Sequence, residues 1–149
     1  MKYLSKFIKF ESKSEFRIPE EVSEGEFQEK KFQFGQEPHG RHVQFTSDEK
    51  DFLKGLTINS PIIRGGWSRR LFSPKQFDHL KVFDGDYFFT ISIYNSTGDF
   101  CLFKIKITKL EDNWYLIDYY LYLDGNTKYY ICDDWEEVLG YLSSEGFNI

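Results

Sequence analysis

The chain contains no alanine, and it has only two cysteines, four prolines and one methionine among its 149 residues. Because alanine is the strongest helix former, its absence removes the residue on which long helices most often depend. Aromatic residues supply much of the apolar content instead, since Phe, Tyr and Trp make up 19% of the chain and favour β-strands. The composition therefore predicts a fold in which sheet dominates over helix.

Motifs with a direct chemical meaning are also lacking. The chain has no nucleophile elbow, no phosphate-binding glycine loop, no dinucleotide fingerprint and no zinc-protease spacing. His39 and His42 are close in sequence, but a structural zinc site needs four ligands and nothing nearby completes the set. The sequence gives no reason to expect a metal or another cofactor, and an enzyme remains only as an alternative with a site assembled from distant residues.

The two cysteines, Cys101 and Cys132, lie within predicted strands and lack the spacing of a metal or redox motif. We expect both to act as small buried apolar side chains. A disulfide between them is an alternative only if their strands are neighbours.

No apolar run approaches the roughly 18 residues that a membrane-spanning helix needs. The N-terminal MKYLSKFIKFES mixes lysines with apolar residues and does not resemble a signal peptide. We therefore expect an intracellular, non-secreted protein without a membrane segment, whether cytoplasmic, organellar or viral.

Four aromatic-rich runs between Tyr87 and Cys132 are separated by turn residues, which predicts an antiparallel meander. In the run Phe100–Lys109, apolar residues beginning with Cys101 alternate with Lys104, Lys106 and Thr108, as in a strand with one buried and one wet face.

The run Trp114–Leu123 is largely apolar on both faces, so we expect a central strand. Its second face, with Trp114, Tyr120 and Tyr122, then needs a cover. That cover is either the protein's own N-terminal segment or a partner, since Tyr and Trp are enriched at protein interfaces.

Start signals predict short helices. Thr46 followed three residues later by Glu49 forms a capping box, which predicts a helix at about 47–55. Ser73 before Pro74 predicts a helix at about 74–83, because proline loses nothing at the first helical position.

A third capping signal lies near the C-terminus. Asp133 followed by Glu136 predicts a helix at about 133–144. The fold class is therefore α+β: an antiparallel β-meander sheet of four to six strands, with the second and third helices packed on one face. We expect a single domain over residues 1–149, in which residues 1–46 form an irregular N-terminal arm that packs on the body or extends from it.

A basic segment offers the clearest binding motif. Arg64, Trp67, Arg69 and Arg70 surround a glycine pair, and Arg41 lies in an earlier turn. Guanidinium groups bind phosphate or carboxylate bidentately, and an indole offers a stacking surface. The alternative is a connection in which the tryptophan fills the core and the arginines pair with C-terminal acids.

Charge limits these options. The chain has a formal net charge of −5 and a pI of about 5.2, with nine acids and one lysine from Glu111 onward. Because nonspecific nucleic-acid binding needs a broad basic surface, it is not expected. Our leading hypothesis is a noncatalytic binding or assembly module that docks into a larger protein complex through its aromatic sheet face and N-terminal arm. The first alternative is an anion- or RNA-contacting protein that uses Arg64–Arg70.

Overall fold

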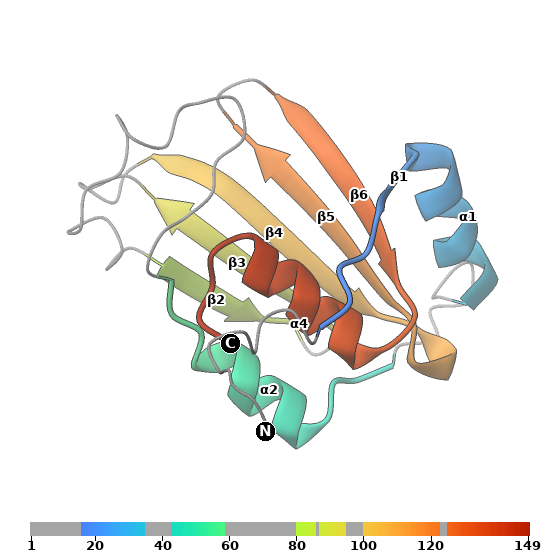
Figure 1. The fold of residues 1–149 in the computed structure, drawn as a ribbon, viewed down its shortest axis with the longest axis horizontal. Helices are drawn as coiled ribbons and strands as arrows, with labels where there is room; N and C mark the ends of the chain where they lie inside the picture. Colours follow the sequence, from blue (N-terminus) through green and yellow to red (C-terminus); the bar gives the residue numbers. More distant parts are fainter. Residues whose placement is uncertain (1–15, 35–42, 59–79, 86, 95–99, 123–124) are drawn as a thin grey trace, which may run out of the picture.

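The computed structural model describes residues 16–34, 43–58, 80–85, 87–94, 100–122 and 125–149, and it contains one antiparallel sheet with helices (Figure 1). The elements in chain order are β1 (Glu21–Val22), α1 (Glu24–Phe34), α2 (Ser47–Lys54), β2 (Leu80–Asp84), β3 (Phe88–Tyr94), β4 (Cys101–Lys109), the 3-10 turn η3 (Glu111–Asn113), β5 (Tyr115–Leu121), β6 (Asn126–Cys132) and α4 (Trp135–Ser144).

The sheet has six strands in the order β1-β6-β5-β4-β3-β2, and every neighbouring pair is antiparallel. Strands β2 to β6 follow one another in sequence, so the predicted meander and the α+β class are confirmed. The short strand β1 adds a sixth member beside β6. Strand β5 lies inside the sheet, between β4 and β6, as its apolar faces predicted.

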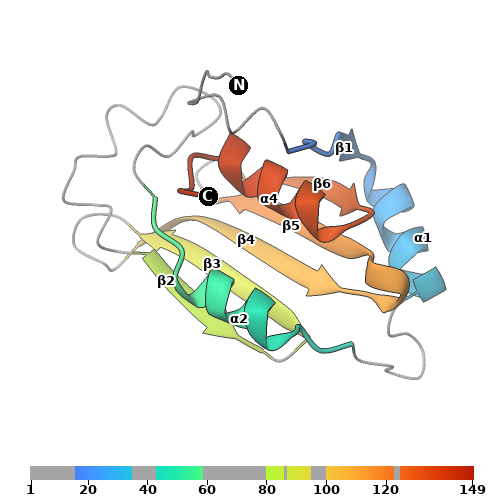
Figure 2. The same cartoon turned by 60° about the horizontal axis from the view of Figure 1, so that its bottom comes forward.

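Helices α2 and α4 lie on the same face of the sheet (Figure 2). Leu53 of α2 and Val138 of α4 are fully buried in one cluster with Ile105 of β4 and Ile117 of β5. Each such side chain contributes about 1.5–3 kcal/mol on burial. This layer is the main core.

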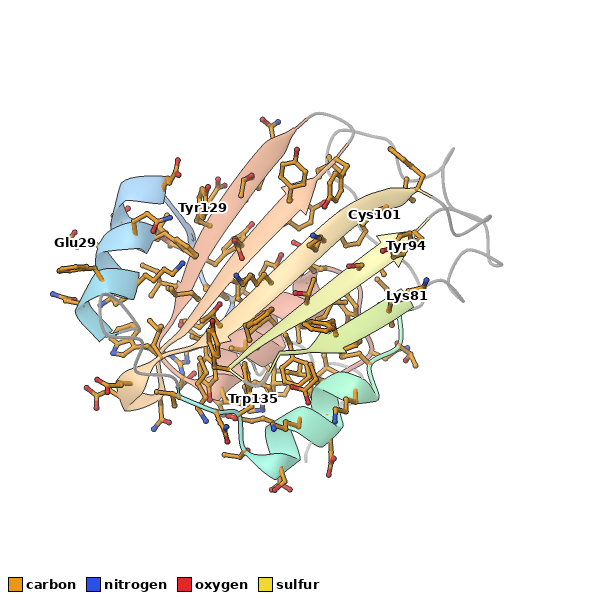
Figure 3. All side chains as sticks on the ribbon, turned by 180° about the vertical axis from the view of Figure 1, so that it is seen from behind. Glu29, Lys81, Tyr94, Cys101, Tyr129 and Trp135 are labelled. Atoms are coloured by element: carbon orange, nitrogen blue, oxygen red, sulfur yellow. The ribbon has the colours of Figure 1, made fainter. Side chains whose placement is uncertain are left out.

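The opposite face carries a smaller apolar cluster close to β6. Phe27 of α1 packs with Leu110 and Leu116, and Trp114 and Tyr129 are partly buried against them. One end of the second face of β5 is therefore covered by the chain's own N-terminal arm. Over β2, β3 and β4 this face has no helix or strand on it among the described residues, as Figure 3 shows from behind.

The N-terminal arm is more regular than expected. Residues 16–34 hold both β1 and α1, and α1 went unpredicted because it lacks an amphipathic pattern and buries only Phe27 among its described side chains. The predicted helix at 47–55 is confirmed, with the Thr46 and Glu49 capping box formed and Gly55 at its end.

The predicted helix at 74–83 is wrong where it can be compared with the structure. Leu80–Asp84 is strand β2, and residues 74–79 lie outside the described residues. Leu80 and Val82 pack against the core, whereas Phe83 is 59% exposed. The segment alternates with a period of two, and each of its residues pairs with a residue of β3. This pairing outweighed the helix start signal at Ser73 and Pro74.

The C-terminal helix begins at Trp135, slightly later than expected, and Asp134 rather than Asp133 caps it. The Asp134 side chain accepts from the backbone N–H of Glu137 at 3.0 Å, and the Asp133 N–H donates to the Glu137 carboxylate at 2.9 Å. Both aspartates have a glutamate three residues later, so the pattern alone did not choose between them.

A β-bulge corrects the expected position of Cys101. Ile93 faces Phe103 and Tyr94 faces Cys101, so β4 has one extra residue at this point. Cys101 therefore lies on the opposite face from Phe103, next to Ser92. Both cysteines are free thiols. They lie at opposite ends of the sheet, since Cys101 begins β4 whereas Cys132 faces Tyr115, which faces Lys109 at the end of β4.

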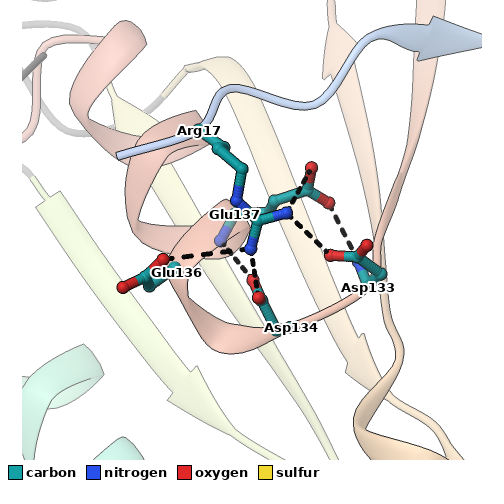
Figure 4. A network of polar contacts seen from close by, with 5 residues as sticks. All are labelled: Arg17, Asp133, Asp134, Glu136 and Glu137. Carbon is teal, nitrogen blue, oxygen red and sulfur yellow. Dashed lines mark hydrogen bonds and ion pairs between the residues drawn. The ribbon is translucent and has the colours of Figure 1, made fainter. Parts of the chain in front are cut away.

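The arm crosses closely over α4. A Cβ atom built on Gly140 would lie 1.9 Å from the carbonyl oxygen of Arg17. The Arg17 guanidinium meets the acids that open α4 (Figure 4), at 3.3 Å from Asp133 and 3.6 Å from Glu137. Glycine at position 140 is thus required by backbone contact rather than by its own φ angle.

A buried charged hub joins α2 to the sheet. The Glu49 carboxylate accepts from the Lys109 ammonium at 2.9 Å, from the Tyr115 hydroxyl, and from the backbone N–H of Thr46 at 2.8 Å. Burial raises the pKa of Glu49, but these donors outweigh it and hold the pKa below its ordinary value of 4.5.

We expect Gly140→Ala to destabilise the protein by about 1–3 kcal/mol, because the added methyl group displaces the Arg17 backbone. Chemical denaturation measures this. The control is Gly25→Ala in α1, where the nearest atom to an added Cβ is the Ser23 hydroxyl at 3.9 Å. The control should gain up to about 1 kcal/mol from helix propensity. Equal effects of the two substitutions would contradict the close crossing.

We expect Glu49→Ala to cost about 3–5 kcal/mol, because the buried Lys109 ammonium loses its counter-ion. Glu26→Ala is the matched control, since Glu26 forms an equivalent but exposed capping box with Ser23, and it should cost about 1 kcal/mol or less. Because the pKa of Glu49 is lowered by folding, its contribution is present above 4.5 and is lost as the pH falls through the folded value. The difference between wild type and Glu49→Ala should therefore shrink in acid.

Candidate functional site

The face of the sheet opposite α2 and α4, which we call the open face, is assembled by strand register. Across four strands Lys81 faces Ser92, Ser92 faces Lys104, and Lys104 faces Tyr120. Neighbouring strands are about 4.8 Å apart, so the Cα atoms of Lys81 and Lys104 are about 10 Å apart. This row places two ammonium groups on either side of a small hydroxyl residue.

The next row runs parallel to the first. Phe83 faces Thr90, Thr90 faces Lys106, and Lys106 faces Asp118, which in turn faces Tyr129. Lys104 and Lys106 are two residues apart on β4, which separates their Cα atoms by about 7 Å along the strand. We call Lys81, Lys104 and Lys106 the lysine triad.

Each member of the triad lies over an aromatic ring. The Nζ atom is 4.9 Å from the Tyr94 ring centroid for Lys81, 5.8 Å from Tyr122 for Lys104, and 4.8 Å from Phe88 for Lys106. Such cation–π contacts are worth about 0.5–1 kcal/mol at exposed sites. The rings therefore support the lysine side chains and orient the ammonium groups on this face.

The Lys104 ammonium is stabilised in its charged form. A hydrogen bond with Tyr122 is the main cause that raises the pKa of Lys104, and burial opposes it less strongly. The Tyr122 ring also packs edge-on against Tyr120, with centroids 4.5 Å apart, and Tyr122 is 38% exposed. This corner of the open face thus combines a fixed cation with an accessible aromatic surface.

Asp118 is the carboxylate of the two rows. It is half-buried, and burial raises its pKa above the ordinary value of 3.8, although Lys106, Lys31 and Lys104 act in the opposite direction. The Lys106 ammonium lies on the neighbouring strand, directly across the ladder. Asp118 therefore only partly offsets the positive charge of the triad.

Cys101 also lies on this face, but its chemistry is unfavourable for nucleophilic attack. Burial raises the pKa of the thiol above its ordinary value, and the nearby Lys104 ammonium lowers it only in part. A thiol with a raised pKa is protonated at neutral pH, whereas the thiolate is the nucleophile. The open face accordingly presents charge and aromatic surface rather than a reactive sulfur atom.

The sequence-predicted site residues are divided by the structure. Tyr120 and Tyr122 lie together on the open face. Trp114 lies at its other end, within the cluster under α1, with the Lys30 ammonium 3.9 Å from its ring centroid. Arg41, Arg64, Trp67, Arg69 and Arg70 lie outside the described residues, so the arginine segment stays a prediction.

The lysines were missed as site residues, although the signal for two of them was present. The alternation in Phe100–Lys109 placed Lys104 and Lys106 on the wet face. Lys81 was hidden because its segment was interpreted as a helix, and its distance to Lys104 depends on pairing through β3.

Comparison of the chain with protein-family models, curated proteins and solved structures gave no match in any of the three. None of the helices in the described ranges has both the length and the apolar character needed to cross a membrane. Within those same ranges, no group of three or more His, Cys, Asp and Glu side chains is arranged to hold a metal ion.

We expect Asp118→Asn to raise the melting temperature at neutral pH by a few degrees. An acid whose pKa is raised by folding destabilises the folded state when ionised, and this penalty disappears once it is protonated in both states. The gain should therefore vanish as the pH falls below 3.8. Asp51→Asn, at an exposed position on α2, is the control and should change little. A loss of stability in Asp118→Asn would show that its pairing with Lys106 outweighs burial.

Proposed function

We propose that this protein is a noncatalytic docking module that binds a protein partner through the open face of its sheet. The observation that carries the proposal is the concentration of aromatic and lysine side chains on this face, whose part over β2, β3 and β4 no helix or strand covers among the described residues. The other face is already filled by α2 and α4.

The exposed apolar surface supports a protein partner. Phe83 is 59% exposed at one edge of the open face, and Tyr122 is 38% exposed at the far end of β5. Aromatic side chains are enriched at protein interfaces, because they bury a large area at a low cost in conformational entropy. An interface that covers both residues spans the face from β2 to β5.

The half-covered state of β5 supports the same proposal. Leu116 is 1% exposed under Phe27 of α1, whereas Tyr122 on the same face remains accessible. Within its described residues, the N-terminal arm therefore provides only part of the cover that the sequence led us to expect. A partner that continues this layer would bury the remaining aromatic surface.

Site-specific photocrosslinking in native cell extract tests the proposal. A benzophenone amino acid replaces either Phe83 on the open face or Ile18 on the side of α4, two positions with the same exposure of 59%. We expect a discrete protein adduct from position 83 and none from position 18. The adduct should be lost when Tyr120 and Tyr122 are both changed to alanine.

Adducts of equal yield from both positions, or none from position 83, would count against docking through the open face. An adduct removed by ribonuclease would support the nucleic-acid alternative instead.

A further inference from the structure

We infer that the segment docked on the open face is an extended, acidic stretch of the partner, held by its carboxylates on the lysine triad. This inference rests on the proposed function and specifies the chemistry of the partner. Lys81, Lys104 and Lys106 belong to one face, and the cross-strand rows that contain them hold one acid, the half-buried Asp118. The triad therefore carries an excess of positive charge.

The covered rings distinguish an acidic peptide from a nucleic acid. Single-stranded nucleic acids bind to sheets largely by stacking bases on open aromatic faces. Here a lysine ammonium lies 4.9 Å from the Tyr94 ring centroid and another lies 4.8 Å from the Phe88 ring centroid. At these two rings an ammonium group, rather than the ring plane, is presented to a ligand, which favours carboxylates.

The spacing of the triad fits an extended chain. Side chains at positions i and i+2 of a β-strand lie on one side and are about 7 Å apart, which equals the separation of Lys104 and Lys106 along β4. Acids at alternate positions of a partner segment would meet both lysines in register. Lys81, two strands away, would receive a third acid from the same segment where it crosses toward β2.

The acids at the start of α4 also affect how the partner is oriented. The acids Asp133, Asp134, Glu136 and Glu137 gather at the start of α4, on the other side of the sheet, and Arg17 is the cation that pairs with them. An acidic segment is repelled from that side and attracted to the triad. The acids at the start of α4 therefore strengthen the preference of an acidic segment for the open face.

Fluorescence anisotropy with a labelled peptide of four Glu-Ser repeats tests the inference at low ionic strength, where exposed charges are least screened. The test variant carries Lys81→Gln, Lys104→Gln and Lys106→Gln. The control variant carries Lys50→Gln, Lys54→Gln and Lys128→Gln, which removes the same charge from α2 and β6. A peptide of Gln-Ser repeats and an oligothymidine are the comparison ligands.

We expect the Glu-Ser peptide to bind the wild type and the control equally, and the test variant about tenfold more weakly, since three exposed ion pairs are lost and each changes affinity by up to about fivefold. The Gln-Ser peptide should bind none of them. Equal binding to both triple variants, or stronger binding of oligothymidine than of the Glu-Ser peptide, would overturn the inference.

The photocrosslink separates this result from the proposed function. If the test variant keeps the position-83 adduct that Tyr120→Ala with Tyr122→Ala abolishes, the face docks a protein but not through acidic groups, and the inference fails alone. If position 83 gives no adduct in any variant, the proposed function fails with it.

Discussion

The buried contact between Glu49 and Lys109 fixes which face of the sheet the helices cover. Lys109 follows Ile105 and Ile107 on β4 with the spacing of a single face, so it points into the core, where an unpaired ammonium would be strongly unfavourable. Glu49 supplies the counter-charge from the first turn of α2, and Tyr115 of β5 adds a second donor. The hub therefore binds α2 to two central strands. It also forces the lysines at intervening positions of β4, Lys104 and Lys106, onto the open face.

The N-terminal arm sets the limits of the open face. It runs from the α4 side, where Arg17 and Gly140 hold it, past the edge of β6 as strand β1, and onto the other side as α1. Because α1 buries mainly Phe27, it covers only the end of the sheet beside Leu116. A longer or more apolar helix would have covered the tyrosines as well. The polar character of α1 is thus the physical reason that accessible surface remains on β3, β4 and the end of β5.

Much of the fold was readable from local patterns, and the failures share one cause. Alternation in β5 and in the Phe103–Ile107 part of β4, and the capping box at Thr46, depend on residues close in sequence, and these predictions are confirmed. The strand at Leu80–Asp84 depends on its pairing with β3, and the position of Cys101 depends on an unpredicted bulge. Arg17 meets its carboxylates across more than a hundred residues of sequence. The candidate site was predicted only in part for the same reason, since Lys81 joins Lys104 through tertiary pairing.

The two faces of the sheet separate stability from recognition. The sequence already shows that acidic residues are concentrated after Glu111. In the fold, the acids of α4 lie on one side of the sheet and the lysine triad lies on the other. The triad and its rings lie outside the main core, whereas the charged hub lies within it. Substitutions on the open face therefore change the electrostatic potential that a partner meets without opening a cavity. A protein with a net negative charge can in this way keep a local cluster of lysines, because the sheet separates the triad from the four acids at the start of α4.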